Sequence, residues 1–225
     1  MRKFIRKGGF FVENKVENLL MVYCADDGEL KILLKKNNEE PYKNYWILPG
    51  EILDTKTTQE ESTMNLFKGV TSLNCSNFIQ GGVFTELGRK IGERTIAIVS
   101  IVITDRSVAD LKMKKGFEWF DIDELPKLAF DHRKIILSVS EELKSKIIQN
   151  YSDILLKLFP SDFTLTEFQR FYENMLGKKI DRRNFRKKMM SQDLVIDTGE
   201  KTSNKTGRPG TLYRFNVENM RGKRL

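Results

Sequence analysis

The C-terminal part of the chain constrains the fold most, because two helix signals follow each other with only a short turn between them. Thr164 and Glu167 form an S/T-x-x-E capping box, the pattern that opens a helix. Gly177 is suited to end that helix in the left-handed conformation. Asp181 is suited to cap a second helix soon afterwards. Two short strand candidates follow, so the sequence predicts helix, short turn, helix and β-hairpin in that order.

This order of elements is typical of a winged helix-turn-helix, whose second helix enters the major groove of DNA. The net charge of the chain is +8, and nearly all of the excess lies after Pro160. Clustered positive charge is the electrostatic footprint of a nucleic-acid partner. A basic helix face that only contacts solvent would give the same charge. The order of helix cap, turn and hairpin therefore favours double-stranded DNA as the partner over a face that only contacts solvent.

The candidate DNA-binding residues fall into two groups. On the second helix they lie opposite the apolar residues Phe185 and Met189, where Arg can bond guanine and Asn can bond adenine. This group is Arg182, Arg183, Asn184, Arg186 and Lys187. The hairpin supplies the second group, Lys201, Lys205 and Arg208. These cations are suited to phosphate oxygens or to a minor groove.

The first part of the chain predicts a separate domain of mixed strands and helices. Asp27 and Gly28 lie between two apolar runs, which is a strong hairpin signal. A helix is expected over residues 58–71, opened by a second capping box. Another helix is expected over residues 131–149, where apolar residues recur at helical spacing. Strands mixed with two helices point to an α/β or α+β domain.

The segment Tyr45–Asn74 resembles the signature region of Nudix domains, in which glutamates at helical spacing bind Mg²⁺ or Mn²⁺ against a diphosphate. The framework of that region survives in Trp46, Leu48, Pro49, Gly50, Phe67 and Leu73. The glutamates of the signature fall on Thr57, Leu66, Gly69 and Val70.

The consequence of these replacements follows from helix geometry. Positions 66, 69, 70 and 73 are spaced to share one helix face, and that face is apolar. It offers no oxygen ligands for a hard cation. Glu60 and Glu61 remain, but in the first turn they are expected to cap the helix and complement its dipole. We therefore expect no metal, no cofactor and no Nudix hydrolase activity.

With both parts in view, the chain resembles the NrtR family of Nudix-related transcriptional regulators. The matching segments are Asp26–Gly50, Leu125–Ile136, Phe163–Met189 and Thr206–Asn216, and the likeness spans roughly residues 5–216. The resemblance implies an α+β fold: a Nudix-like α/β/α sandwich with a mixed sheet over residues 1–155, then a winged helix-turn-helix over residues 156–225. It implies a homodimeric repressor that binds an operator.

The resemblance also implies that the Nudix-like domain senses a small molecule, either ADP-ribose or a pentose-type sugar. Arg89 and Arg94 match the spacing of two basic residues in the family. Two guanidinium groups can hold phosphates without a metal. We assign Arg89, Arg94 and Trp46 to this effector site. Ordinary charge on a surface loop is the alternative interpretation of the two arginines.

Other functions are weighed against this one. A Nudix hydrolase with a basic accessory domain would need carboxylates from elsewhere, such as Glu86 or Glu93. An RNA-binding module would need exposed aromatic residues, whereas those of the tail recur at core spacing. The single histidine, His132, is expected to be structural. The absence of a long apolar segment and the two unpaired cysteines favour a cytoplasmic protein without a membrane partner.

Overall fold

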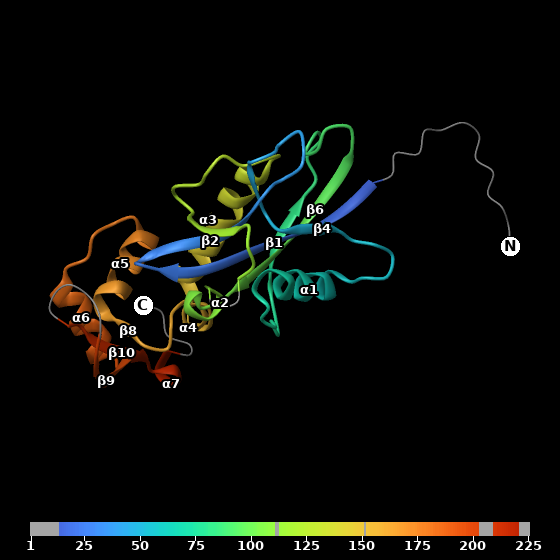
Figure 1. Cartoon of the computed structure of the whole chain (residues 1–225). Coiled ribbons are helices and arrows are strands. Elements are labelled where there is room, and N and C mark those ends of the chain that lie inside the picture. The colour runs from blue at the N-terminus through green and yellow to red at the C-terminus, as the bar shows by residue number, and fades with distance from the viewer. Residues whose placement is uncertain (1–13, 111–112, 151, 203–208, 221–225) are drawn as a thin grey trace, which may run out of the picture.

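The computed structural model describes residues 14–110, 113–150, 152–202 and 209–220. A seven-stranded mixed sheet carries helices on both faces, and a smaller unit with its own three-stranded sheet follows it (Figure 1). The predicted α/β/α sandwich, followed by a winged helix-turn-helix, is therefore confirmed. No helix among the described residues combines the length and apolar character needed to cross a membrane.

The large sheet is built around β1 (Asn14–Asp26). It pairs in parallel with β6 (Arg94–Ile103) and antiparallel with β2 (Glu29–Lys36), which confirms the predicted hairpin. The strand order is β3-β2-β1-β6-β5, with β4 paired to β1 and β7 paired to β2. These other strands are β3 (Trp46–Ile47), β4 (Gly50–Ile52), β5 (Ile79–Phe84) and β7 (Phe117–Asp121).

Each face of the sheet has its own core because successive residues of a strand point to opposite sides. On one face, α3 (His132–Asn150) covers every second residue of β1, namely Leu19, Met21 and Tyr23. On the other face, α1 (Gln59–Thr71) covers the intervening residues Leu20 and Val22. The alternation of one strand thus builds both layers of the sandwich.

Helix α1 begins and ends as predicted for residues 58–71, so position 73 is not part of it. The backbone N–H of Thr58 donates to the Glu61 carboxylate at 2.9 Å, and Glu61 N–H donates back to the Thr58 hydroxyl at 3.2 Å. At the other end Ser72 has a φ of 59°, in the left-handed region, which closes the helix. Leu73 therefore lies beyond the helix, which corrects its placement on the helix face with Leu66 and Val70.

The winged unit contains α5 (Leu165–Leu176) and α6 (Arg182–Ser191), joined by a turn that starts at Gly177 with a φ of 63°. Its sheet has the order β8-β10-β9, from β8 (Phe163–Thr164), β9 (Val195–Lys201) and β10 (Thr211–Phe215). Three short helices that the sequence did not separate are α2 (Arg106–Asp110), α4 (Ser152–Leu158) and α7 (Val217–Met220).

The two units contact each other directly. The tip of the β1–β2 hairpin lies on α5, where Arg170 donates to the Asp27 carboxylate at 2.8 Å and Asn174 donates to the Gly28 carbonyl at 2.9 Å. Gly28 has a φ of 81°, and a Cβ at this position would lie 2.4 Å from the Arg170 side chain. Glycine is thus required for both conformation and close approach. One hydrophobic cluster also runs from β1 and α3 into the winged unit.

Candidate functional site

The position of the Nudix signature is a shallow hollow with mainly apolar walls. Its volume is about 220 Å³, and Leu66, Gly69 and Val70 of α1 form one side. The remaining lining residues are Lys35, Pro49, Gly50, Glu51, Asn65 and Phe117. Glu51 is the single carboxylate among them, and it accepts a hydrogen bond from Ser62 at 2.6 Å. Because Mg²⁺ prefers several oxygen ligands, this donor set does not fit the ion of a Nudix site.

The two glutamates left in the first turn of α1 do not replace the missing ones. Glu61 closes the capping box, and the hydrogen bond from the Thr58 backbone holds the pKa of Glu61 below its ordinary value. Glu60 lies in the same turn and is exposed. Among the described residues, no group of three or more histidine, cysteine, aspartate and glutamate side chains is placed to hold a metal ion.

A network of side-chain hydrogen bonds lies beneath α1, and no pattern in the sequence predicts it. Buried Asn18 of β1 donates to the hydroxyls of Ser62 and Thr63 at 2.9 and 3.0 Å. The Ser100 hydroxyl of β6 donates to the side-chain amide oxygen of Asn18 at 2.9 Å. These groups satisfy one another in the core, and Ser62 in turn donates to the Glu51 carboxylate. They attach α1 to the sheet and are not available to a ligand.

The three predicted effector residues lie in different surroundings. The side chain of Arg89 is 1% exposed, and its guanidinium donates to Asp131 at 2.7 and 3.1 Å. Arg94 donates to the Thr85 carbonyl at 2.7 Å. Trp46 is buried with its ring edge-on to Phe120. Both guanidinium groups thus make hydrogen bonds within the protein, whereas Nη1 of Arg89 has no partner among the described residues. Their contact with an effector stays a prediction.

His132 is buried at the start of α3, next in the chain to Asp131. Its Nδ1 accepts a hydrogen bond from the Leu48 backbone N–H at 3.0 Å. Burial, with added repulsion from Lys90 and Arg89, lowers the pKa of His132 to about 3. The imidazole is therefore neutral at physiological pH and holds the connection between β3 and β4 at Leu48. This contact gives His132 a structural role.

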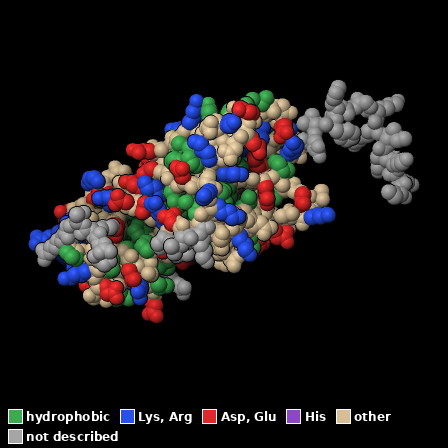
Figure 2. All heavy atoms as spheres, viewed as in Figure 1, with side chains coloured by type: hydrophobic (Ala, Val, Ile, Leu, Met, Phe, Trp, Pro, Cys, Tyr) green, Lys and Arg blue, Asp and Glu red, His purple; other side chains and the backbone are tan. Residues whose placement is uncertain are grey.

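Helix α6 presents a basic surface to solvent. The Asp181 carboxylate caps it by accepting from the Asn184 N–H at 2.8 Å, as predicted. Phe185 and Met189 are buried, as the sequence also indicates. The polar residues assigned to DNA are all exposed: Arg182, Arg183, Asn184, Arg186 and Lys187. Lys and Arg side chains protrude at this end of the molecule (Figure 2).

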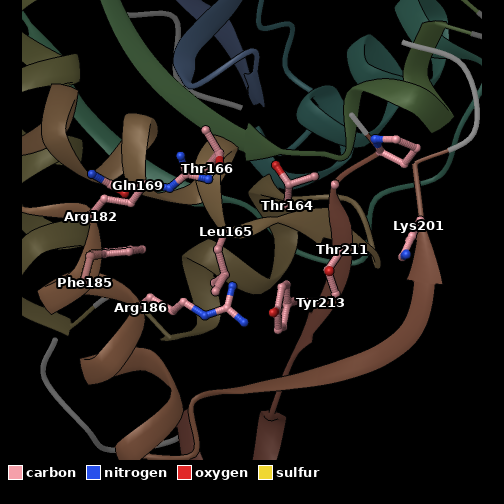
Figure 3. Close-up of a pocket in the computed structure, with 12 residues that line it drawn as sticks. Thr164, Leu165, Thr166, Gln169, Arg182, Phe185, Arg186, Lys201, Thr211 and Tyr213 are labelled. Atoms are coloured by element: carbon pink, nitrogen blue, oxygen red, sulfur yellow. Dashed lines mark hydrogen bonds between the residues drawn. The ribbon is translucent and has the colours of Figure 1, made fainter. Parts of the chain in front are cut away.

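The residues of the hairpin are partly described. Lys201 is exposed at the end of β9, whereas Lys205 and Arg208 lie outside the described residues. Lys201 faces α6 across a cleft of about 490 Å³ (Figure 3). Arg182 and Arg186 line the opposite side of this cleft. The structure thus brings cations from the helix and from the hairpin together around one depression.

The turn between α5 and α6 depends on a residue that the sequence did not single out. Glu173 accepts hydrogen bonds from the Ile180 backbone N–H and from Gln169, each at 2.9 Å. These bonds, led by that from Ile180, lower the pKa of Glu173 to about 2. The carboxylate therefore stays ionised and fixes the angle at which α6 leaves the turn.

Comparison with known proteins supports both units. Residues 155–215 match the NrtR DNA-binding winged helix domain. The chain is 27% identical, over 88% of its length and 81% of the other protein, to the ADPR-responsive transcriptional repressor NtrR of Acinetobacter baylyi. It is 38% identical, over 47% of its length and 63% of the other protein, to an ADP-ribose pyrophosphatase of Methanocaldococcus jannaschii.

A solved structure shows the same architecture in one chain. The crystal structure of Shewanella oneidensis NrtR in complex with a 27mer DNA aligns with a TM-score of 0.71 and 23% identity. The alignment covers 91% of this chain and 95% of the other. At this identity the match supports the shared fold, with a Nudix-type sandwich followed by a winged helix.

Proposed function

We propose that this chain, a Nudix-related regulator of the NrtR family, is a ligand-responsive transcriptional repressor that binds an operator in double-stranded DNA. The observation that carries the proposal is the exposed basic face of α6, next to a hairpin that adds Lys201. The match of residues 155–215 to a DNA-binding winged helix domain supports it independently. In such domains the second helix meets base edges and the wing meets the backbone or a minor groove.

The proposed contacts divide by chemistry. Arg183 and Asn184, near the start of α6, read base edges. Phosphate contacts come from Arg182, Arg186, Lys187 and Lys201, and Lys205 and Arg208 are proposed to add to them. In a homodimer, two-fold symmetry would place the two α6 helices on half-sites about 34–36 Å apart. We also propose a domain boundary between residues 1–155 and 156–225. Helix α4 runs across this boundary.

The effector is proposed to be ADP-ribose or a pentose-type sugar. The printed name of the Acinetobacter relative, an ADPR-responsive repressor, favours ADP-ribose. Trp46, Arg89 and Arg94 remain the proposed contacts. The Arg89 side chain is buried, so a phosphate could reach it only after neighbouring residues moved. Its Nη1 has no hydrogen-bond partner among the described residues, and it is the donor left for a phosphate while Nε and Nη2 stay bonded to Asp131. That movement would give the domain a second state for a ligand to select.

A thermal-shift screen tests the effector. ADP-ribose, NAD-related compounds and pentoses are added separately to the full chain. A ligand that binds the native state at about 100 times its Kd stabilises it by roughly 2.7 kcal/mol. For a chain of this size we expect the melting temperature to rise by about 5–10 °C. The same compound should change the midpoint of DNA binding. The effector proposal is wrong if none of these compounds moves the melting temperature.

We further propose that the chain is a regulator without hydrolase activity, because its signature hollow offers one carboxylate where a divalent ion needs several. The pyrophosphatase relative keeps hydrolysis as the second candidate function. With Mg²⁺ and ADP-ribose present, we expect product release at the buffer rate, measured by chromatography. Turnover that disappears in Glu51→Gln would contradict the proposal, whereas turnover unchanged in that variant would indicate a contaminating enzyme.

A further inference from the structure

We propose that the cleft between α6 and the β9–β10 hairpin binds one phosphate of the DNA backbone, with the Tyr213 hydroxyl as a buried hydrogen-bond donor to it. This inference rests on the proposed DNA-binding function and assigns Tyr213 a role that charge and exposure do not reveal. It also separates the cations of α6 that hold the backbone from those that read bases.

The composition of the cleft fits an anion. Three cations line it, Arg182 and Arg186 from α6 and Lys201 from β9 (Figure 3). The other lining residues are hydroxyl, amide, apolar or glycine residues: Thr164, Leu165, Thr166, Gln169, Phe185, Pro209, Gly210, Thr211 and Tyr213. None of the residues lining the cleft is acidic.

The buried hydroxyl of Tyr213 supports a phosphate site independently of the charges around the cleft. Its side chain on β10 is 1% exposed, and its hydroxyl has no hydrogen-bond partner among the described residues. A buried hydroxyl without a partner is costly, and most buried polar groups in proteins have one. The ring lines the cleft beneath Arg186, whose guanidinium carbon lies 5.8 Å from the ring centroid. Arg186 is exposed and free to move aside as a strand enters.

The geometry of the duplex explains why a backbone strand would pass here. A helix in the major groove and a hairpin at the adjacent minor groove lie on either side of one sugar–phosphate strand. That strand must therefore cross the depression between them, which is this cleft. Its phosphate would meet Tyr213 at the bottom and cations on both sides, as charge-assisted hydrogen bonds require.

The same geometry divides α6 into two functional faces. Arg182 and Arg186 are four residues apart, so they share the face that borders the cleft. Arg183 and Lys187 share a different face, and neither they nor Asn184 line the cleft. Residues on the cleft face position the protein on the backbone. Of the residues outside it, Arg183 and Asn184 remain free to contact bases.

Tyr213→Phe tests the hydroxyl while keeping the ring. DNA binding is measured by fluorescence anisotropy on a duplex that the unaltered protein selects from a random pool. We expect the affinity to fall about ten-fold, the size of one hydrogen bond to a charged group. The loss should be equal on selected and scrambled duplexes. The melting temperature should stay equal or rise, because the substitution removes an unpaired hydroxyl. Tyr172→Phe, which does not line the cleft, should bind DNA normally.

A second experiment identifies which phosphate of the duplex binds in the cleft. Single backbone phosphates of the duplex are replaced, one at a time, by uncharged methylphosphonates. One replacement should weaken binding of the unaltered protein and weaken Tyr213→Phe much less, because the two groups interact. Additive losses at every position, or unchanged affinity in Tyr213→Phe, would overturn the phosphate site alone. A protein that selects no duplex would overturn the DNA-binding proposal as well. Inorganic phosphate at millimolar concentration should shift the melting temperatures of the unaltered protein and of Tyr213→Phe equally. That result distinguishes binding of a phosphate within a DNA strand from binding of the free anion.

Discussion

Replacing Arg183 and Asn184 together by alanine is expected to remove most of the sequence preference of DNA binding while the fold stays intact. Both side chains are exposed on α6, and neither borders the cleft beside the hairpin. A bidentate contact to a base is worth about 1–3 kcal/mol of discrimination. Loss of two such contacts corresponds to roughly one to four orders of magnitude in preference. The measurement is anisotropy on a selected duplex in competition with a scrambled one.

Lys201→Ala is the matched control, because Lys201 is proposed to contact a phosphate. It should weaken binding to both duplexes alike and lower the dependence of log affinity on log salt by about one. The circular-dichroism spectra of both variants should match that of the unaltered protein. If Arg183→Ala/Asn184→Ala keeps its preference for the selected duplex, α6 is not the element that reads the bases.

Replacing Phe168 by alanine is expected to destabilise the chain by about 3–5 kcal/mol. Phe168 is fully buried on α5 at the centre of an aromatic cluster. Its ring lies 5.1–5.6 Å, between centroids, from those of Phe159, Phe163, Phe185 and Phe215. The loss is a large part of the 5–15 kcal/mol typical of folded proteins. Urea unfolding followed by circular dichroism measures it.

The number of transitions in the unfolding curve shows whether the two units unfold together. The hydrophobic cluster around Phe168 continues into the core under α3, and Arg170 and Asn174 attach α5 to the β1–β2 hairpin. We therefore expect Phe168→Ala to shift one cooperative transition. Leu87→Ala, at a side chain 84% exposed, should change stability by less than about 0.5 kcal/mol. Two separate transitions would show that the units fold independently, and an unchanged midpoint would show that the cluster contributes little.

Local chemistry determined much of what the sequence predicted correctly. The capping boxes at Thr58 and Thr164, and the cap at Asp181, involve partners three residues away. Such contacts form wherever the helix forms, so the sequence suffices to locate them. The loss of ligands at Leu66, Gly69 and Val70 was equally visible, because side-chain chemistry does not depend on the fold. The basic face of α6 followed from helical periodicity alone.

Contacts between distant residues were decided only by the tertiary structure. Arg89 appears in the sequence as a free cation on a loop, yet it is buried against Asp131, 42 positions away. Arg170 meets Asp27 across 143 positions, and the cleft joins residues of α5, α6 and the three strands β8, β9 and β10. The unpaired hydroxyl of Tyr213 becomes apparent only when every neighbour is placed.

The sequence by itself thus determined which local elements form and which glutamates of the Nudix signature are replaced in this chain. The tertiary structure decided which charged groups are already engaged and which remain available to a partner. The physical reason is range: a helix cap or an apolar stripe is satisfied within a few residues, whereas the partner of a buried charge or hydroxyl depends on how the whole chain packs.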